Sequence, residues 1–422
     1  MSNPERQPYE GGMEDRKREL EPRPFENTII ALDVDGVLVR PVAYRQAIRS
    51  TINFFAEQMG VDPDEFLLDD RNRTPGRNMS HFEAEGIHDP WDASAIIVSL
   101  MRLKKAGINV SNSDALEAFR DNASAQSHPP DVVLQWLQGR YGAEIPDVIE
   151  DIAGTLSETR DPFRNEITGV FQEYVLGKET FELTYGSQSR TGAEESLIKT
   201  KDRSLVDDAV RREIEKISQE GGMVVIYTGR PGLPPPDADR EESDGYAPEA
   251  ELAIEKSRVK AIGIVSMGSM EWLGRETGTP VEELTKPNPT QALATVLTAI
   301  RGRVNKQVLL DAYEWAVNGV EPEDVKELVE RGELKLVVVE DSPSGVRAFI
   351  NARKILEEEG INAKLTAIGV HDVSFEKHMA FVKLGHEGID TMDTNSGIRE
   401  GIIRFSYGVQ EENRDLWLGS SQ

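Results

Sequence analysis

Residues 28–39, TIIALDVDGVLV, constrain the fold of this chain more than any other segment. The run from Ile29 to Leu32 is unbroken and apolar, which is typical of a strand buried on both faces of a parallel sheet. Asp33 and Asp35 follow this run, and Gly36 can adopt backbone angles that let the chain turn sharply there. We therefore expect an α/β protein with two carboxylates at the carboxyl end of a parallel strand, where open α/β sheets bind ligands.

Three further segments follow in a defined order. The first is an apolar strand, Met223–Tyr227, which ends in TGR. The second is the run KPNP, which begins at Lys286 and opens a helical pattern. The third is an apolar strand at residues 334–339, which ends in EDS. Polar residues thus end two more predicted strands, as Asp33 and Asp35 end the first.

Together the motifs DVDGV, TGR, KPNP and VEDSPSG resemble the haloacid dehalogenase (HAD) superfamily of aspartate-nucleophile phosphotransferases. Each motif is short, but all four occur in order and on the expected elements. The segments AYRQAIRSTINFF, HFEAEGIHDPWDAS and FQEYVLG are similar to a group within HAD subfamily IA, so the resemblance covers residues 28–375. It implies a Rossmann-like core with a parallel sheet of about five strands flanked by helices, and an inserted, mostly α-helical C1 cap.

The resemblance implies phosphoryl transfer through an aspartyl-phosphate. Asp33 is the candidate nucleophile, because carboxylate attack on phosphorus divides a very slow hydrolysis into two easier steps. Asp35 is the implied general acid and base. Mg²⁺ suits this chemistry, and the expected ligands are Asp33, Asp341 and the backbone carbonyl of Asp35, with Glu340 binding directly or through water.

The other two motifs are expected to bind the phosphoryl group. The Thr228 hydroxyl and neighbouring backbone N–H groups at Gly229 and Arg230 would hold phosphate oxygens, and Lys286 would neutralise charge in the transition state. Each motif alone also has a purely structural interpretation. DxDG can be a simple turn, TGR a strand-to-helix connection, the lysine a solvated helix-start residue, and the ED pair a helix cap.

Composition agrees with an enzyme that acts on a small molecule. The 422 residues include 38% hydrophobic residues, enough for a sizeable core, and no cysteine, which excludes disulfides and Cys-based zinc sites. The net charge of −27 argues against nucleic acid as a partner. We expect no membrane association, because no secretory signal pattern and no apolar run of spanning length is present, and we expect a cytoplasmic monomer or homodimer.

Composition also divides the chain. Residues 1–25 are polar and rich in Pro, Glu and Arg, and are expected to form a disordered tail. The predicted catalytic core is discontinuous and comprises residues 26–41 and 201–405. Between its two parts, residues 42–200 show helical periodicity and form the predicted cap. Residues 406–422 are expected to be a C-terminal tail.

The polar stretch 71–92 of the cap contains five candidate specificity residues: Arg77, His81, His88, Trp91 and Asp92. Arginine suits a second phosphate or a carboxylate, and Trp91 could stack on a sugar ring. The alternative is a surface loop followed by a helix that Asp92 caps, with Trp91 packed in the core. Arg45 and Gln46, near the expected mouth of the site, are weaker candidates.

Two segments of the core have more open interpretations. The loop from Pro231 to Glu249 is rich in Pro, Asp, Glu and Gly and is either a mobile flap or, as we favour, a solvated surface insertion. The run SMGSMEWLG favours packing roles for Met267, Met270 and Trp272 over ligand contacts.

The expected function is Mg²⁺-dependent hydrolysis of a small phosphate monoester, such as a sugar phosphate. One alternative is a sugar phosphomutase, in which the cap excludes water and returns the phosphoryl group. A second is a non-catalytic protein that binds a phosphorylated metabolite, which the presence of both Asp33 and Asp35 disfavours. Dehalogenation is disfavoured because Asp35 and the acidic pair imply metal-dependent phosphoryl chemistry.

Overall fold

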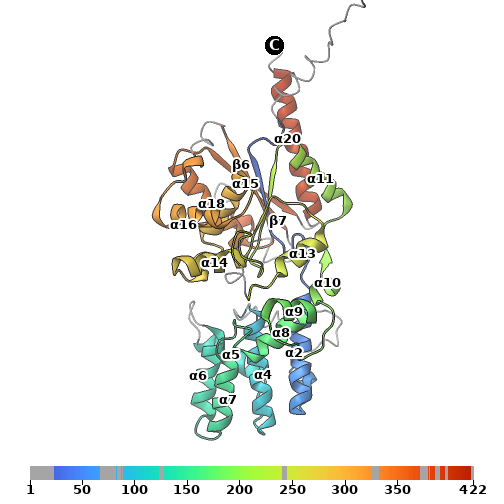
Figure 1. Cartoon of the computed structure of the whole chain (residues 1–422), viewed down its shortest axis with the longest axis vertical. Coiled ribbons are helices and arrows are strands. Elements are labelled where there is room, and N and C mark those ends of the chain that lie inside the picture. Colours follow the sequence, from blue (N-terminus) through green and yellow to red (C-terminus); the bar gives the residue numbers. More distant parts are fainter. Residues whose placement is uncertain are drawn as a thin grey trace, which may run out of the picture.

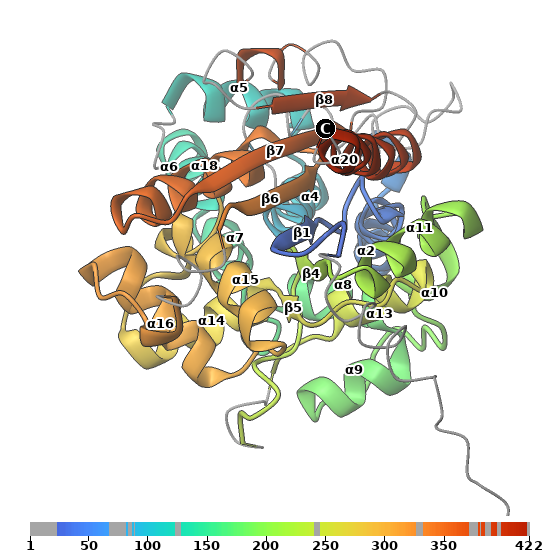
Figure 2. The same ribbon diagram turned by 90° about the horizontal axis from the view of Figure 1, so that it is seen from above.

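A parallel sheet of six strands forms the centre of the fold (Figure 2). This computed structural model describes residues 23–66, 82, 87, 89–122, 128–239, 245–325, 332–370, 379, 381–384, 390–394 and 398–419. The strand order is β5-β4-β1-β6-β7-β8, and every pairing is parallel. The strands are β1 (Thr28–Leu32), β4 (Met223–Tyr227), β5 (Ile264–Val265), β6 (Leu334–Glu340), β7 (Ala363–Val370) and β8 (Asp390–Thr394).

The central strand β1 is buried on both faces, as its apolar run predicted. Ile30 and Leu32 belong to the apolar cluster on one face of the sheet, whereas Ile29 and Ala31 belong to the cluster on the other. Helices cover both faces (Figure 2). One side carries α11 (Asp208–Gln219), α13 (Glu249–Ser257) and α20 (Ile398–Gly419), and the other carries α14 (Met267–Thr277), α15 (Pro289–Arg301), α16 (Lys306–Asn318) and α18 (Pro343–Glu358).

A helical block is inserted after β1 and lies at one end of the molecule (Figure 1). Its apolar residues join the cluster on the α11 side of the sheet, so the packing is continuous between the two parts. The block contains α2 (Ala43–Met59), α4 (Pro90–Lys105), α5 (Asn112–Asn122), α6 (Pro129–Tyr141), α7 (Pro146–Leu156), α8 (Glu166–Leu176), α9 (Lys178–Tyr185) and α10 (Leu197–Lys201). The predicted fold class, a Rossmann-like α/β core with a helical cap, is therefore confirmed.

Two short strands connect the sheet to the helical block. β2 (Val39–Arg40) leads into the block, β3 (Arg203–Ser204) leads out of it, and the two pair in antiparallel fashion. Asp202 joins the same two connections, since its Oδ1 accepts hydrogen bonds of 2.8 Å from the backbone N–H groups of Val42 and Ala43. The helical block is thus attached through a small, hydrogen-bonded double linker.

The structure differs from the sequence-based expectations at three places. The sheet has a sixth strand, β8, whose sequence DTMDT lacks the apolar run that identified the others. Helix α4 begins at Pro90 with Asp89 as its N-cap, and Asp92 lies in the first turn, because proline at the first helical position sets the start of the helix. Helix α20 extends to Gly419, through most of the range expected to be a tail. Within the described residues, no helix combines the length and apolar character needed to cross a membrane.

Candidate active site

Three of the four sequence motifs meet at the carboxyl end of the sheet. β1 lies between β4 and β6, so Asp33, Thr228 and Glu340 stand at the ends of three adjacent strands. The fourth motif contributes Lys286, which precedes α15 and reaches the same point. Because parallel strands all end at one edge, residues more than 300 positions apart in the sequence become neighbours.

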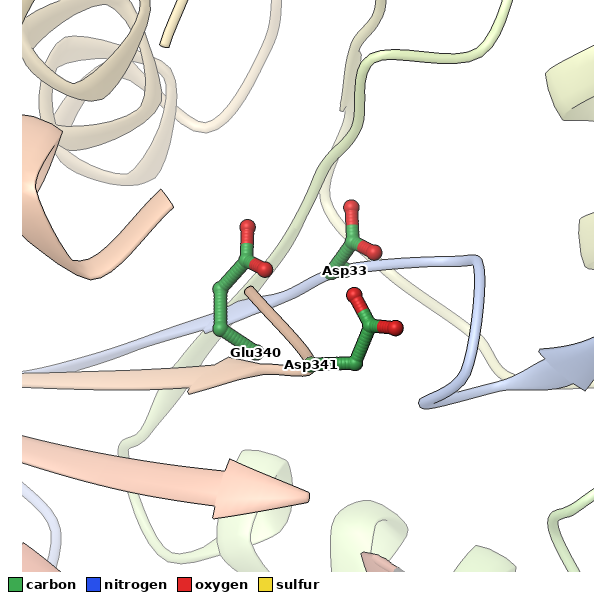
Figure 3. A group of neighbouring side chains, drawn as sticks. All are labelled: Asp33, Glu340 and Asp341. Atoms are coloured by element: carbon green, nitrogen blue, oxygen red, sulfur yellow. The ribbon is translucent and has the colours of Figure 1, made fainter. Parts of the chain in front are cut away.

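Three carboxylates form the centre of this site (Figure 3). Asp33, Glu340 and Asp341 each offer an oxygen, and these oxygens lie within 4.8 Å of one another. Gly36 allows this close approach: its φ is +74°, and a Cβ atom there would lie 2.6 Å from Asp341 Oδ2. Gly36 is therefore needed both for its backbone angle and for the space that it leaves to Asp341.

Lys286 links two of these carboxylates. Its Nζ donates a 2.9 Å hydrogen bond to Asp33 Oδ1 and a short one to Glu340 Oε1, and it lies 4.1 Å from the centroid of the Tyr227 ring. Burial lowers the pKa of Lys286, but Asp33 and Glu340 outweigh that effect and hold it above the usual value. For Asp33, burial raises the pKa and Lys286 opposes the rise. The lysine is a fixed positive charge at the centre of the site.

Glu340 is held on both of its oxygens. Oε1 accepts from Lys286, and Oε2 accepts from the backbone N–H of Ser342 at 3.1 Å and from its hydroxyl at 2.9 Å. Gly345 makes room for this side chain, because a Cβ there would lie 1.8 Å from Oε1. Glu340 is completely buried. This arrangement fits a residue that positions Lys286 better than one that binds a metal ion directly.

Arg230, expected from the sequence to contact substrate, is bound by protein carboxylates instead. Its guanidinium donates to both oxygens of Asp35, at 2.6–3.0 Å, and to Asp202 Oδ2 at 2.8 Å. The residue is only 2% exposed, and its Cζ lies 5.0 Å from the centroid of the Tyr44 ring. Because Asp202 also holds the linker to the cap, Arg230 connects Asp35 with that linker.

Thr228 and Gly229 lie where the sequence placed them, directly after β4. Thr228 is 1% exposed; its N–H donates to the Val265 carbonyl at 3.1 Å, and its hydroxyl accepts from the Arg230 N–H at 3.2 Å. Its carbonyl accepts from Gln291 Nε2 at 2.8 Å. One of the two backbone N–H groups expected to hold phosphate, that of Arg230, thus already donates within the protein, to the Thr228 hydroxyl.

A cavity of about 1000 Å³ opens beside these residues, between core and cap. Asp35, Gly229, Arg230 and Lys286 line its inner end. Trp91 lies in its wall and also packs against the apolar core, so both interpretations of this residue describe part of its environment. Arg77, His81 and His88 lie outside the described residues.

Several residues of the cavity carried no sequence signal. Tyr44 lines it, whereas its neighbours Arg45 and Gln46 do not. The Tyr44 hydroxyl donates to Glu249 Oε2, and Gln172 Nε2 donates to Glu249 Oε1 at 2.9 Å. Burial raises the pKa of Glu249 to about 7.

The proline-rich loop and the methionine run also contribute to the cavity. Pro231 and Glu249, the two ends of the loop, both line it, and the Ala250 N–H donates to the Pro231 carbonyl at 2.8 Å, which ties the ends together. Residues 240–244 of the loop lie outside the described residues. Met267 lines the cavity as well, whereas Met270 and Trp272 are buried in the core as expected.

The donor set fits a hard divalent cation. All three clustered groups are carboxylates, which Mg²⁺ accepts readily, and Lys286, which binds two of them, lines the neighbouring cavity. Both oxygens of Glu340 already accept hydrogen bonds, which disfavours this residue as a direct ligand of such an ion. Among the described residues, no other group of three or more potential ligands is clustered so closely.

Comparisons with known proteins support the fold alone. No protein-family model matches the chain, and no curated protein matches it. A protein solved by X-ray crystallography as a Northeast Structural Genomics Consortium target is similar in structure, with a TM-score of 0.60 and 16% identity. The likeness covers 89% of this chain and 98% of that one. A hydrolase from Pseudomonas syringae aligns over the same shares at 11% identity, but its TM-score of 0.30 is too low to support an argument. The α/β core with its helical cap is therefore shared with a solved protein of very different sequence.

Proposed function

We propose that this protein is a Mg²⁺-dependent HAD-type phosphatase that hydrolyses a small phosphate monoester through an aspartyl-phosphate. The observation that carries the proposal is the group formed by Asp33, Glu340, Asp341 and Lys286, whose lysine lines the cavity. Gathering three carboxylates around one buried lysine costs folding free energy, and groups with such strained charge balance are concentrated at functional sites.

In the proposed reaction, Asp33 attacks phosphorus and forms a P–O bond, while the bond from phosphorus to the leaving alcohol oxygen breaks. Asp35, which lines the cavity, gives a proton to that oxygen. Asp35 then takes a proton from water as the water oxygen attacks phosphorus, which releases inorganic phosphate and restores Asp33. When bound, Mg²⁺ would screen the repulsion between the anionic nucleophile and the anionic phosphate.

Other side chains orient these groups. Lys286 lies next to the nucleophile, and its positive charge would offset negative charge on the transferring phosphoryl group in the transition state. Arg230 holds the Asp35 carboxylate through two nitrogen donors, Nε and Nη2, and thereby sets its orientation. Arg230 thus becomes a positioning residue in this proposal and no longer a substrate ligand.

The test is phosphate release from a panel of phosphate monoesters, with and without Mg²⁺. Wild type should release phosphate only with Mg²⁺, and Asp33→Asn should abolish release. Asp64→Asn, an exposed aspartate of the cap outside the cavity lining, is the matched control and should behave as wild type. Release that persists in Asp33→Asn would refute the proposed nucleophile, and isomer formation without release would identify a mutase.

A further inference from the structure

The outer part of the cavity has an unusual charge balance. Among the described residues that line it beyond the catalytic end, five are acidic and one is basic: Asp89, Asp92, Glu249, Glu271, Glu282 and Arg160. They come from both the cap and the core, so the excess of negative charge surrounds the space between the two. Any leaving group of the substrate must occupy this space.

Arg160 does not balance this charge. Its guanidinium lies 3.0 Å from Glu282 Oε1, 3.5 Å from Asp89 Oδ2 and 3.9 Å from Asp92 Oδ2. The single positive charge of Arg160 is therefore shared among three carboxylates. Glu249 receives its hydrogen bonds from neutral donors, a tyrosine hydroxyl and an amide, and the nearby Arg230 is already bound to Asp35 and Asp202.

One carboxylate oxygen of Asp92 is buried without a hydrogen-bond donor among the described residues. The residue is 1% exposed, and its Oδ1 accepts from the Thr159 hydroxyl and lies 3.5 Å from His128 Nε2. Its Oδ2 accepts no hydrogen bond from any residue that the structure describes. A buried carboxylate oxygen without a donor costs free energy, and a ligand that donates to it would recover that cost.

The pKa values of the wall reflect buried carboxylates that lie close to one another. Burial raises the pKa of Asp89 to about 6, with Asp92 adding to the rise. Burial likewise raises the pKa of Glu271 to about 7; Arg275 opposes the rise, and the nearby Glu249 and Glu282 add to it. A cation placed among these groups would favour their ionised forms.

The carboxylates are too dispersed to hold a bare metal ion. Among the described residues, only Asp33, Glu340 and Asp341 bring three ligand atoms within 4.8 Å of one another, and none of the wall carboxylates belongs to that group. A volume of about 1000 Å³ instead fits an organic group of several atoms, and Trp91 supplies an aromatic surface beside it.

We infer that the leaving group of the substrate carries a protonated amine, which the carboxylates of the cavity wall recognise. The substrate class is then a phosphate monoester of an amino alcohol or amino sugar. This inference rests on the proposed function, because it assigns the phosphate end of the same molecule to Asp33 and Lys286. The ammonium remains protonated throughout hydrolysis and takes no part in bond breaking.

Matched pairs of esters test the inference. Glucosamine 6-phosphate and glucose 6-phosphate differ only in one amine, and phosphoethanolamine and 2-hydroxyethyl phosphate form a smaller pair that fits the same space. We expect kcat/KM to favour the amine member by about tenfold or more, equivalent to ~1.4 kcal/mol, in at least one pair. N-Acetylglucosamine 6-phosphate, which lacks the charge, should lose the advantage.

A variant pair locates the preference in the wall. Glu271→Gln keeps the shape of the side chain and removes its charge, so the amine-to-hydroxyl ratio of kcat/KM should fall at least threefold. Glu276→Gln lies on the same helix, is exposed and does not line the cavity, so it should keep the wild-type ratio. Equal ratios in the two variants would overturn the assignment to this wall.

Binding separates failure of this inference from failure of the proposed function. Calorimetric titration of Asp33→Asn protein with glucosamine 6-phosphate and glucose 6-phosphate, in Mg²⁺, measures recognition without turnover. Tighter binding of the amine would support the inference even if no ester were hydrolysed. Hydrolysis of esters without amine preference in either pair, or equal binding, would refute it while leaving the phosphatase proposal intact.

Discussion

Gly36→Ala tests whether the turn after β1 exists to make space for a metal ligand. Any L-residue at φ +74° carries a strain of about 1 kcal/mol or slightly more. In addition, the new Cβ would lie 2.6 Å from Asp341 Oδ2, whereas ordinary contacts begin at 3.4 Å, so the carboxylate must move by about 0.8 Å. Functional groups need to be held within roughly 0.5 Å, so this shift should disturb metal binding.

The expected loss of Mg²⁺ affinity is roughly tenfold or more, the effect usual for disturbed support of a metal ligand. At a Mg²⁺ concentration of about 100 times the wild-type Kd, binding stabilises the folded protein by ~2.7 kcal/mol; a tenfold weaker Kd leaves only ~1.4 kcal/mol. The assay is thermal unfolding as a function of Mg²⁺ concentration, which requires no knowledge of the substrate.

Gly302→Ala is the control. Gly302 has a φ of +69°, and a Cβ atom added there would meet no neighbouring atom within 4 Å, so the substitution brings similar strain without a clash. Gly302→Ala should lose about 1 kcal/mol without metal and Gly36→Ala at least as much, and only Gly36→Ala should need more Mg²⁺ to reach half of its stabilisation. The reasoning would be refuted if the two variants and wild type responded to Mg²⁺ at the same concentration.

Two further predictions concern the buried network behind the cavity. Asp202→Asn removes the charge that Arg230 binds at 2.8 Å. Because both side chains are buried, the free energy of unfolding should fall by on the order of 3 kcal/mol and the thermal midpoint should fall with it. An unchanged midpoint would contradict this prediction. Glu249 gives a pH dependence: its pKa is raised to about 7 from 4.5, so the folded state holds a proton that the unfolded state releases between these values. The free energy of unfolding of wild type should therefore fall by on the order of 3 kcal/mol relative to that of Glu249→Gln as the pH rises from about 4.5 to about 7. The measurement is denaturation of wild type and Glu249→Gln at each pH across this range. A constant difference between their free energies of unfolding would contradict the prediction.

Local sequence patterns were enough to predict the sheet and its polar ends. The apolar runs before Asp33, Thr228 and Glu340 identified three strands, and parallel strands with helices between them end at one edge, so these residues were expected to meet. The strand β8 escaped prediction because an edge strand need not be apolar on both faces. The start of α4 was placed three residues late, since Asp89 and Asp92 are both suitable caps and only the position of Pro90 separates them.

The sequence by itself therefore determined the fold class, the carboxylates that end its strands and the lysine that precedes α15, because those features depend on short-range patterns and on an edge common to all parallel strands. Only the tertiary structure decided what Arg230 binds, since its partners Asp35 and Asp202 lie 195 and 28 positions away. The same holds for the acidic wall. Asp92, Glu249 and Glu271 come from three separate helices, and nothing in their local sequence records that packing of the cap on the core places them around one cavity.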